Sequence, residues 1–225
     1  MLQPGQLQQI GPHRVQCGDV TEGLDALMGA QRAEILYVDP PWGAGMLKFF
    51  ATQTKRHTGE SVNVPPLDEF LNTLFTVAAR HTSRYLAVEY GLRWEDKIQR
   101  LALLHGFDPW LIMSARYKSG KLLRPLHVHV FTVGDQPRPA RLVSAVAGTH
   151  GPETPAAVLS VLAPIVRADN PRPVVLDPCC GVGNTARAAL ETGLIFRGNE
   201  VDGVRLAKTV SLLERAHLAS SRELP

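Results

Sequence analysis

Short apolar runs that alternate with helical segments are the feature that most limits how this chain can fold. Such runs are rich in strand formers and lack a polar face, as expected for strands buried on both sides. They lie at residues 33–39, 84–90, 173–178 and 194–202. Segments with apolar residues at helical spacing follow them along the chain. Over 225 residues, this alternation predicts one α/β domain whose open, mostly parallel sheet is covered by helices on both faces.

Two further segments complete the expected architecture. The runs WLIMSARYK and LHVHVFTVG flank SGKLLRP, whose glycine and basic residues indicate the tip of an antiparallel hairpin. Residues 134–155 are rich in Pro and Gly, so we expect a connector between residues 1–133 and 156–225. Residues 43–66 are mostly polar and carry a basic cluster, which predicts a long loop.

Composition narrows the setting in which the chain works. Its 44% hydrophobic residues include no run of 18, so no membrane span is predicted. The amino terminus lacks a basic region followed by an apolar stretch, and we therefore expect no secretory signal. Three cysteines, two of them adjacent, cannot build a disulfide framework, which favours a reducing, cytoplasmic location. The net charge of +3 permits a polyanionic partner without requiring one.

The stretch VVLDPCCGVGNTARAALETG has the layout of a ligand-binding turn. A strand ends at Asp177, Gly181 and Gly183 follow, and a helix then begins. Glycines at such a position let a ligand approach the backbone, and parallel strands of α/β sheets bind ligands at their carboxyl ends. About twenty residues on, a strand ends at Glu200, where a carboxylate can accept hydrogen bonds from ribose hydroxyls. An acid beside the turn suits an amine better than a pyrophosphate, although a purely structural turn would give the same glycine pattern.

The stretch EILYVDPPWGAG ends a buried strand with an acid and a rigid turn. Asp39 lies at the expected strand end, and Pro40 and Pro41 fix the backbone and remove N–H donors. The Asp39 carboxylate and the Pro40 carbonyl can together accept both hydrogens of an exocyclic amino group, which frees the nitrogen lone pair. The ring of Trp42 offers a stacking surface, worth roughly 1–3 kcal/mol for a base taken out of its stack. A proline turn beside a core tryptophan is the structural alternative.

These motifs, in this order, resemble a known family. DPPW, followed 138 residues later by LDPCCGVGNT and then by GNEVD, resembles the S-adenosylmethionine-dependent amino-methyltransferases of DNA that modify adenine N6 or cytosine N4. The order is similar to that of their circularly permuted β class. The resemblance implies a Rossmann-like methyltransferase fold, with residues 1–133 as the catalytic half and 156–225 as the cofactor half. Asp39 favours adenine, because cytosine enzymes of the family more often carry serine there.

The resemblance assigns roles to individual residues. For catalysis it implies Asp39, Pro40, Pro41 and Trp42. For binding S-adenosylmethionine it implies Asp19, His150, Asp177, Pro178, Cys179, Cys180, Gly181, Gly183, Asn184 and Glu200. Two of the family's usual features are missing: Cys179 stands where an aromatic residue is usual, and Thr154 stands where a lysine contacts the cofactor.

A nucleic-acid substrate is expected, with DNA favoured over RNA. The basic residues expected to contact phosphates are Lys55, Arg56, Lys118, Lys121 and Arg124. The family's recognition insert is nearly absent, since only residues 134–150 are available for it. Either sequence specificity is short and loose, or a second copy of the chain in a homodimer or a separate specificity subunit supplies it.

Other functions stay open at this point. DPPW also resembles the messenger-RNA adenosine methyltransferases, and DNA cytosine N4 is a second possible target. A non-catalytic nucleic-acid-binding subunit is the alternative outside enzymes. No metal site is expected, because His127 and His129 alternate on one strand as cross-strand residues do, and the cysteines lack paired zinc-site spacing.

Overall fold

The computed structural model describes residues 2–138 and 146–222. Its elements, in chain order, are β1 (Leu7–Ile10), β2 (His13–Cys17), the 3-10 helix η1 (Val20–Glu22), α1 (Asp25–Met28), β3 (Ala33–Val38), α2 (Ala44–Thr58), α3 (Leu67–His81), β4 (Thr82–Gly91), the 3-10 helix η2 (Leu92–Trp94), α4 (Glu95–Leu104), β5 (Asp108–Ser119), β6 (Leu122–Thr132), β7 (Val146–Thr149), α5 (Glu153–Asp169), β8 (Val174–Asp177), α6 (Asn184–Thr192), β9 (Ile195–Glu200) and α7 (Gly203–Arg222).

The described strands form one sheet in the order β1-β2-β9-β8-β3-β4-β6-β5-β7. From β2 to β4 the strands are parallel, and β6 then runs antiparallel to both β4 and β5. The prediction of a mostly parallel sheet with an antiparallel hairpin is therefore confirmed. Strands from residues 1–133 and 156–225 share this sheet, and the division of the chain into a catalytic and a cofactor half remains an interpretation.

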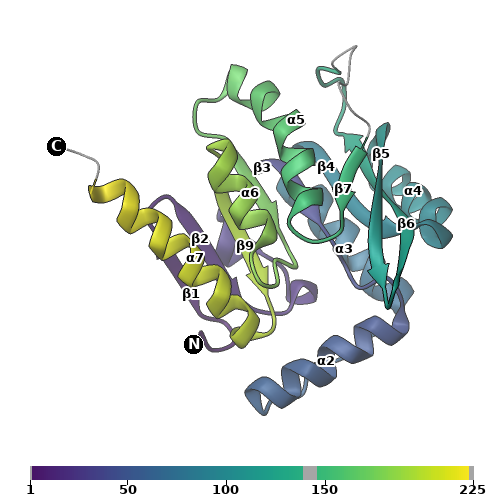
Figure 1. The fold of residues 1–225 in the computed structure, drawn as a ribbon, viewed down its shortest axis with the longest axis horizontal. Coiled ribbons are helices and arrows are strands. Elements are labelled where there is room, and N and C mark those ends of the chain that lie inside the picture. Colours follow the sequence, from purple (N-terminus) through teal and green to yellow (C-terminus); the bar gives the residue numbers. More distant parts are fainter. Residues whose placement is uncertain (1, 139–145, 223–225) are drawn as a thin grey trace.

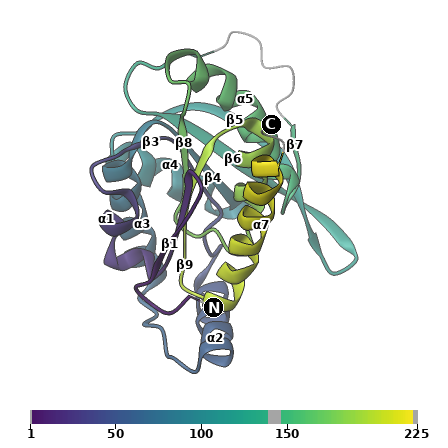
Figure 2. The same cartoon turned by 90° about the vertical axis from the view of Figure 1, so that its left-hand side faces the viewer.

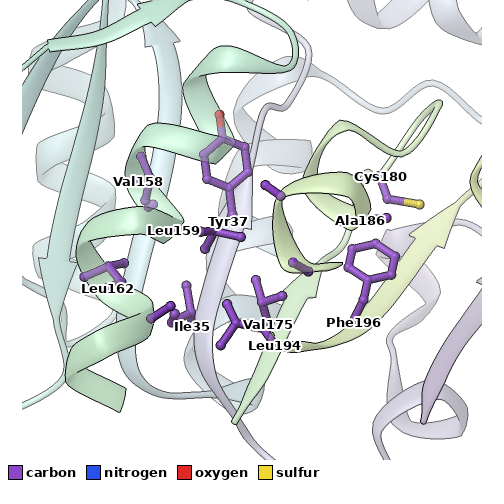
Figure 3. Close-up of a cluster of buried hydrophobic side chains, with 14 of the residues drawn as sticks. Ile35, Tyr37, Val158, Leu159, Leu162, Val175, Cys180, Ala186, Leu194 and Phe196 are labelled. Atoms are coloured by element: carbon purple, nitrogen blue, oxygen red, sulfur yellow. The ribbon is translucent and has the colours of Figure 1, made fainter. Parts of the chain in front are cut away.

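Helices cover both faces of the sheet, so the central strands are buried on both sides (Figure 1). On one face, α5, α6 and α7 pack on Ile35, Tyr37 and Val175. Figure 3 shows this core, with Val158 and Leu159 of α5 beside Tyr37. On the other face, α1, α3 and α4 pack on the alternate residues of the same strands. Burial of both faces explains why the strands read as continuous apolar runs.

The main error of the sequence interpretation concerns residues 43–66. Instead of one long loop, they contain the 15-residue helix α2, which ends at Gly59 in a left-handed conformation. Thr54 is the only residue of α2 that is fully buried, so the helix lacks the apolar stripe that sequence periodicity detects. The connector at 134–155 is also more ordered than expected, because it contains β7, which pairs in parallel with β5. Residues 139–145 of the predicted recognition region lie outside the described residues.

The topology places several segments at one edge of the sheet. Since β2, β9, β8, β3 and β4 are parallel, their carboxyl ends meet there, where ligands bind in folds of this kind. The far end of β5 reaches the same edge, because β5 is antiparallel to β6 and β6 is antiparallel to β4. Both α2 and the β5–β6 hairpin project from the body of the molecule, α2 at the bottom of Figures 1 and 2 and the hairpin to the right in Figure 2. No described helix has the combination of length and apolar character needed to span a membrane.

Candidate active site

The carboxyl ends of the parallel strands surround a cavity of about 240 Å³. The predicted catalytic and cofactor residues line it, with the exception of Trp42 and Gly183. The end of β3 contributes Asp39, Pro40 and Pro41, and the turn after β8 contributes residues 177–182. The fold therefore brings two motifs that are far apart in the sequence to one cavity.

Asp39 presents its carboxylate to this cavity. The side chain keeps 36% of its surface exposed, and its Oδ1 accepts a hydrogen bond of 2.8 Å from the indole N–H of Trp42. Burial raises the pKa of Asp39 and the neighbouring Glu89 carboxylate raises it further, while His150 lowers it. Beside it, Pro41 accepts a hydrogen bond from the Tyr90 hydroxyl, and no donor among the described residues reaches the Pro40 carbonyl. Asp39 and Pro40 both line the cavity, and their action as a pair of acceptors stays a prediction.

Glu89 is the site residue that the sequence analysis missed. It lies near the end of β4, is 1% exposed, and lines the cavity beside Asp39. Its carboxylate accepts hydrogen bonds from the Tyr37 hydroxyl, from the Thr154 hydroxyl at 2.8 Å, and from Nδ1 of His150 at 2.7 Å. A buried acid inside an apolar strand, in the run RYLAVEY, was the signal that could have revealed it.

His150 connects the two acids. Its Nδ1 lies 2.7 Å from Glu89 and 3.7 Å from Asp39 Oδ2. The hydrogen bond to Glu89 raises the pKa of His150, against the opposing effect of burial. His150 thus lies between the two acids at the cavity wall, and its predicted contact with a cofactor stays a prediction.

The Trp42 ring is half-buried and lies next to Asp39. Tyr117 of β5 packs against it edge-on, with ring centroids 4.9 Å apart, and His150 does so at 5.2 Å. The indole N–H orients the Asp39 carboxylate. The structure therefore shows Trp42 as a support for Asp39, and its role as a stacking surface remains a prediction.

Asp177 is placed very differently from Asp39. It is 4% exposed, and both carboxylate oxygens are used by its own turn: Oδ1 accepts from the Cys179 N–H at 3.0 Å, and Oδ2 from the Thr185 hydroxyl at 2.5 Å. Burial raises the pKa of Asp177 to about 7. Asp177 thus shapes the glycine turn, and a direct contact with a cofactor amine would have to share oxygens that already accept hydrogen bonds.

The two other predicted acids of the cofactor site also hold backbone. Glu200 accepts hydrogen bonds from the N–H groups of Gly181 at 2.8 Å and Asp202 at 3.0 Å, and burial raises its pKa. Asp19 caps η1 through the N–H and hydroxyl of Thr21. Both line the cavity and retain lone pairs for a ligand.

The two glycines of the turn have separate reasons to be glycine. Gly181 has φ +53° and lines the cavity, where an added Cβ would lie 2.6 Å from the Arg205 guanidinium. Gly183 has φ +93° and faces Thr209 of α7, whose Oγ1 would lie 2.9 Å from an added Cβ. Gly183 therefore packs against α7 outside the cavity lining, and its expected contact with a cofactor stays a prediction.

Helix α2 forms one wall of the cavity. Its Met46, Leu47 and Phe50 line the cavity, and the guanidinium of Arg205 lies 4.8 Å from the Phe50 ring. At its far end, His57 Nδ1 lies 2.6 Å from Asp202 Oδ2, while Oδ1 of the same acid caps α7. These contacts tie α2, which comes directly after the catalytic motif, to the start of α7.

The predicted phosphate-binding residues are all exposed and gather on two elements. Lys55 and Arg56 lie in the last turn of α2, and Lys118, Lys121 and Arg124 lie at the tip of the β5–β6 hairpin. Both elements project from the same side of the molecule, α2 at the bottom and the hairpin to the right in Figure 2, and the approach of a nucleic acid between them stays a prediction.

The other clusters considered from the sequence lie apart from this chemistry. His127 and His129 are neighbours on β6 and face Glu95 at 3.4 and 3.9 Å, on the opposite face of the sheet from Glu89. Cys17, Cys179 and Cys180 are free thiols, and burial raises the pKa of each. The expectation that the site needs no metal stays a prediction.

Neither a protein-family model nor a curated protein matches the sequence. Solved structures do match. TTHA0409 of Thermus thermophilus, assigned as a DNA modification methylase, aligns over 91% of this chain and 95% of its own, with a TM-score of 0.63 and 16% identity. The fold is shared with DNA methyltransferases.

Two more solved structures agree with this result. M1.HpyAVI aligns over 87% of this chain and 94% of its own, with a TM-score of 0.57 and 13% identity. The PvuII DNA methyltransferase, which is cytosine-N4-specific, aligns over 91% of this chain and 90% of its own, with a TM-score of 0.59 and 10% identity. Both M1.HpyAVI and TTHA0409 have also been solved with S-adenosylmethionine. The predicted methyltransferase fold is confirmed.

Proposed function

We propose that this chain transfers a methyl group from S-adenosylmethionine to the N6 amino group of an adenine taken out of the stack of DNA. One observation carries the proposal: the Asp39 carboxylate and residues 177–182 of the glycine turn line the same cavity, from neighbouring parallel strands. An acceptor for the amino group and a candidate binding turn for a methyl donor are thereby held side by side. Positioning of this kind supplies much of the rate of a group transfer.

The residues present fit S-adenosylmethionine. Gly181 leaves room at the turn, and the acids Asp19, Asp177 and Glu200 favour the positive charges of the ligand. Asn184 and the backbone at 178–182 would hold the amino-acid end, and Asp19 would face the adenosine end. The cofactor supplies an activated methyl group on a positively charged sulfur, so the chain needs no nucleophile of its own.

Asp39 is the catalytic residue of this proposal. Its carboxylate and the Pro40 carbonyl accept the two amino hydrogens, which releases the nitrogen lone pair from the base ring. The methylated nitrogen must then lose a proton, and the raised pKa of Asp39 makes its carboxylate a suitable acceptor. Glu89 and His150 position Asp39, and Trp42 holds one of its oxygens.

A nucleic acid would reach the cavity between α2 and the hairpin. Lys55, Arg56, Lys118, Lys121 and Arg124 would neutralise its phosphates from two sides. Affinity should therefore depend steeply on salt, and each lysine removed should lower the slope of log K against log salt by about 1.

DNA cytosine N4 is the second candidate target. The fold shared with the cytosine-N4-specific PvuII enzyme favours it, whereas Asp39 in place of serine favours adenine. A non-catalytic binding subunit is disfavoured, because the acceptor pair, the glycine turn and the cavity are all intact.

The decisive experiment measures transfer by the purified chain alone. Methyl-labelled S-adenosylmethionine is incubated with unmethylated plasmid DNA and, separately, with RNA, and the digested nucleosides are analysed by mass spectrometry. We expect N6-methyladenine in DNA. N4-methylcytosine in DNA would show that cytosine is the target base instead of adenine, and label in RNA would show that RNA is the substrate. The absence of label in both nucleic acids would refute the proposal.

A cavity-filling variant tests where the cofactor binds. Val182 lines the cavity and is 40% exposed, so Val182→Trp fills the cavity without disturbing the core. Calorimetry should show at least about a ten-fold weaker affinity for S-adenosylmethionine, the equivalent of ~1.4 kcal/mol. Unchanged affinity would remove the glycine turn from the cofactor site.

A further inference from the structure

The tip of the β5–β6 hairpin carries two exposed leucines among basic residues. Leu122 is 60% exposed and Leu123 is 58% exposed, directly after the turn formed by Gly120 and Lys121. Gly120 has φ +61°, which suits the first position of a tight two-residue hairpin turn. Isolated exposed leucines are common, but two adjacent ones at a projecting tip cost solubility without contributing to the core.

Residues just before the tip of this hairpin contact the candidate active site. Tyr117 packs on the Trp42 ring at 4.9 Å, and the N–H of His150 donates to the Arg116 carbonyl at 2.7 Å. Leu122 lies opposite Ser119, two residues beyond Tyr117. At about 3.4 Å per residue, the tip extends roughly 7 Å past the site, or about two base steps of DNA.

The register decides which leucine faces the site. Tyr117 pairs with Arg124 and Ser119 pairs with Leu122, so Leu122 and Arg124 share the face that contacts Trp42. Leu123 pairs with Lys118 and points to the other face. Two leucines of nearly equal exposure thus differ in their direction relative to the cavity.

We propose that Leu122 is an apolar wedge that enters the base stack of duplex DNA and fills the space left by the base held at Asp39. The proposal rests on the proposed function and adds the residue that opens the duplex. Charge complementarity identifies the occupant, since Arg124 shares the face of Leu122, Lys121 precedes it in the turn, and Lys118 lies on the other face of the same tip; together they attract a polyanion. Apolar side chains inserted between base steps are a common way to unstack DNA, and removal of a base from a duplex needs such compensation.

The test compares duplex with already unstacked DNA of the same sequence. Transfer of labelled methyl groups is measured on unmethylated plasmid DNA before and after heat denaturation, and the result is the duplex-to-denatured ratio. Leu122→Ala should lower this ratio about ten-fold, because only the duplex needs opening. Leu122→Phe, which keeps an apolar wedge, should restore most of it.

Two matched controls separate the wedge from a general loss of apolar surface. Leu123→Ala removes an equally exposed leucine one residue away, and Leu218→Ala removes one that is 58% exposed on α7. Both should leave the ratio within about two-fold of the wild-type value. Thermal unfolding of each variant checks that the fold is retained.

The possible outcomes distinguish the wedge from the proposed function. If the wild type methylates denatured DNA only, or if Leu122→Ala leaves the ratio unchanged, the wedge is wrong and methyl transfer stands. An equal fall in Leu123→Ala also overturns it, since the face of the hairpin would not matter. If the wild type methylates neither form, the proposed function fails and the wedge fails with it.

Discussion

Two neighbouring strands of this protein end in the same dipeptide, Asp-Pro, yet the two aspartates are placed in opposite ways. Asp39 follows β3, keeps 36% of its surface exposed and accepts one side-chain hydrogen bond, from Trp42. Asp177 ends β8, is 4% exposed and has both oxygens bound by its own turn. One acid is available to a substrate and the other builds the turn.

The residues immediately after each dipeptide explain the difference. After Asp39, Pro41 stands where Cys179 follows Asp177 and lacks the corresponding backbone N–H, so the turn reaches this carboxylate only through the indole N–H of Trp42. After Asp177, the N–H of Cys179 and the hydroxyl of Thr185 lie within reach and occupy both oxygens. An acid at a strand end is thus a candidate for chemistry only when its own turn leaves it free.

The largest effect should come from Asp39→Ala. Loss of the acceptor should reduce methyl transfer roughly 10²–10³-fold, as removal of a single group that stabilises the transition state does in other enzymes. Affinity for S-adenosylmethionine, measured by calorimetry, should stay nearly unchanged. Loss of cofactor binding together with activity would make Asp39 a structural residue, and the difference proposed between Asp39 and Asp177 would no longer hold.

Asp177→Ala should act on stability instead. It leaves the Cys179 N–H and the Thr185 hydroxyl without their buried partner, which should cost about 1–3 kcal/mol in the free energy of unfolding. Urea unfolding at pH 6 measures it, with Asp39→Ala as the matched control, expected to change stability by less than about 1 kcal/mol. Equal losses in both variants would show that the two acids are equivalent.

The pH dependence of stability tests the protonation state of Asp177. The pKa of Asp177 is raised from 3.8 to about 7 by burial, so the folded state holds a proton that the unfolded state releases. Its stabilising contribution is complete below pH 4 and is lost as the pH rises to about 7, with a slope of up to about 1.4 kcal/mol per pH unit. In Asp177→Asn, the unfolding temperature measured as a function of pH should lack this part of the dependence. A plot of unfolding temperature against pH identical to that of the wild type would contradict the prediction.

The smallest effect is expected from Glu89→Gln, which keeps the shape of the site and removes one charge. Because the hydrogen bond to Glu89 raises the pKa of His150, an NMR titration should show this pKa falling by about one unit or more. Activity should fall about ten-fold as Asp39 loses its positioning. An unchanged His150 pKa would exclude Glu89 from the catalytic group.

Much of the fold could be predicted from the sequence, because buried strands and amphipathic helices leave a periodic pattern. The strands around 33–38 and 174–177 and the helix at 67–81 follow it closely. Helix α2 does not, since one side faces the cavity and the rest faces solvent, so no apolar stripe marks it. It is held by contacts with residues far along the chain, such as His57 with Asp202.

The order of residues along the chain was enough to establish that two acid-headed turns come after buried strands, and which residue types could meet a base and a methyl donor. The three-dimensional arrangement was needed to show that Asp39 stays open while Asp177 is closed. It also brought Glu89, His150 and the hairpin to the same edge of the sheet. Local propensity and periodicity are properties of short segments, whereas hydrogen-bond partners 61 residues apart, such as Glu89 and His150, depend on how the strands are ordered in the sheet.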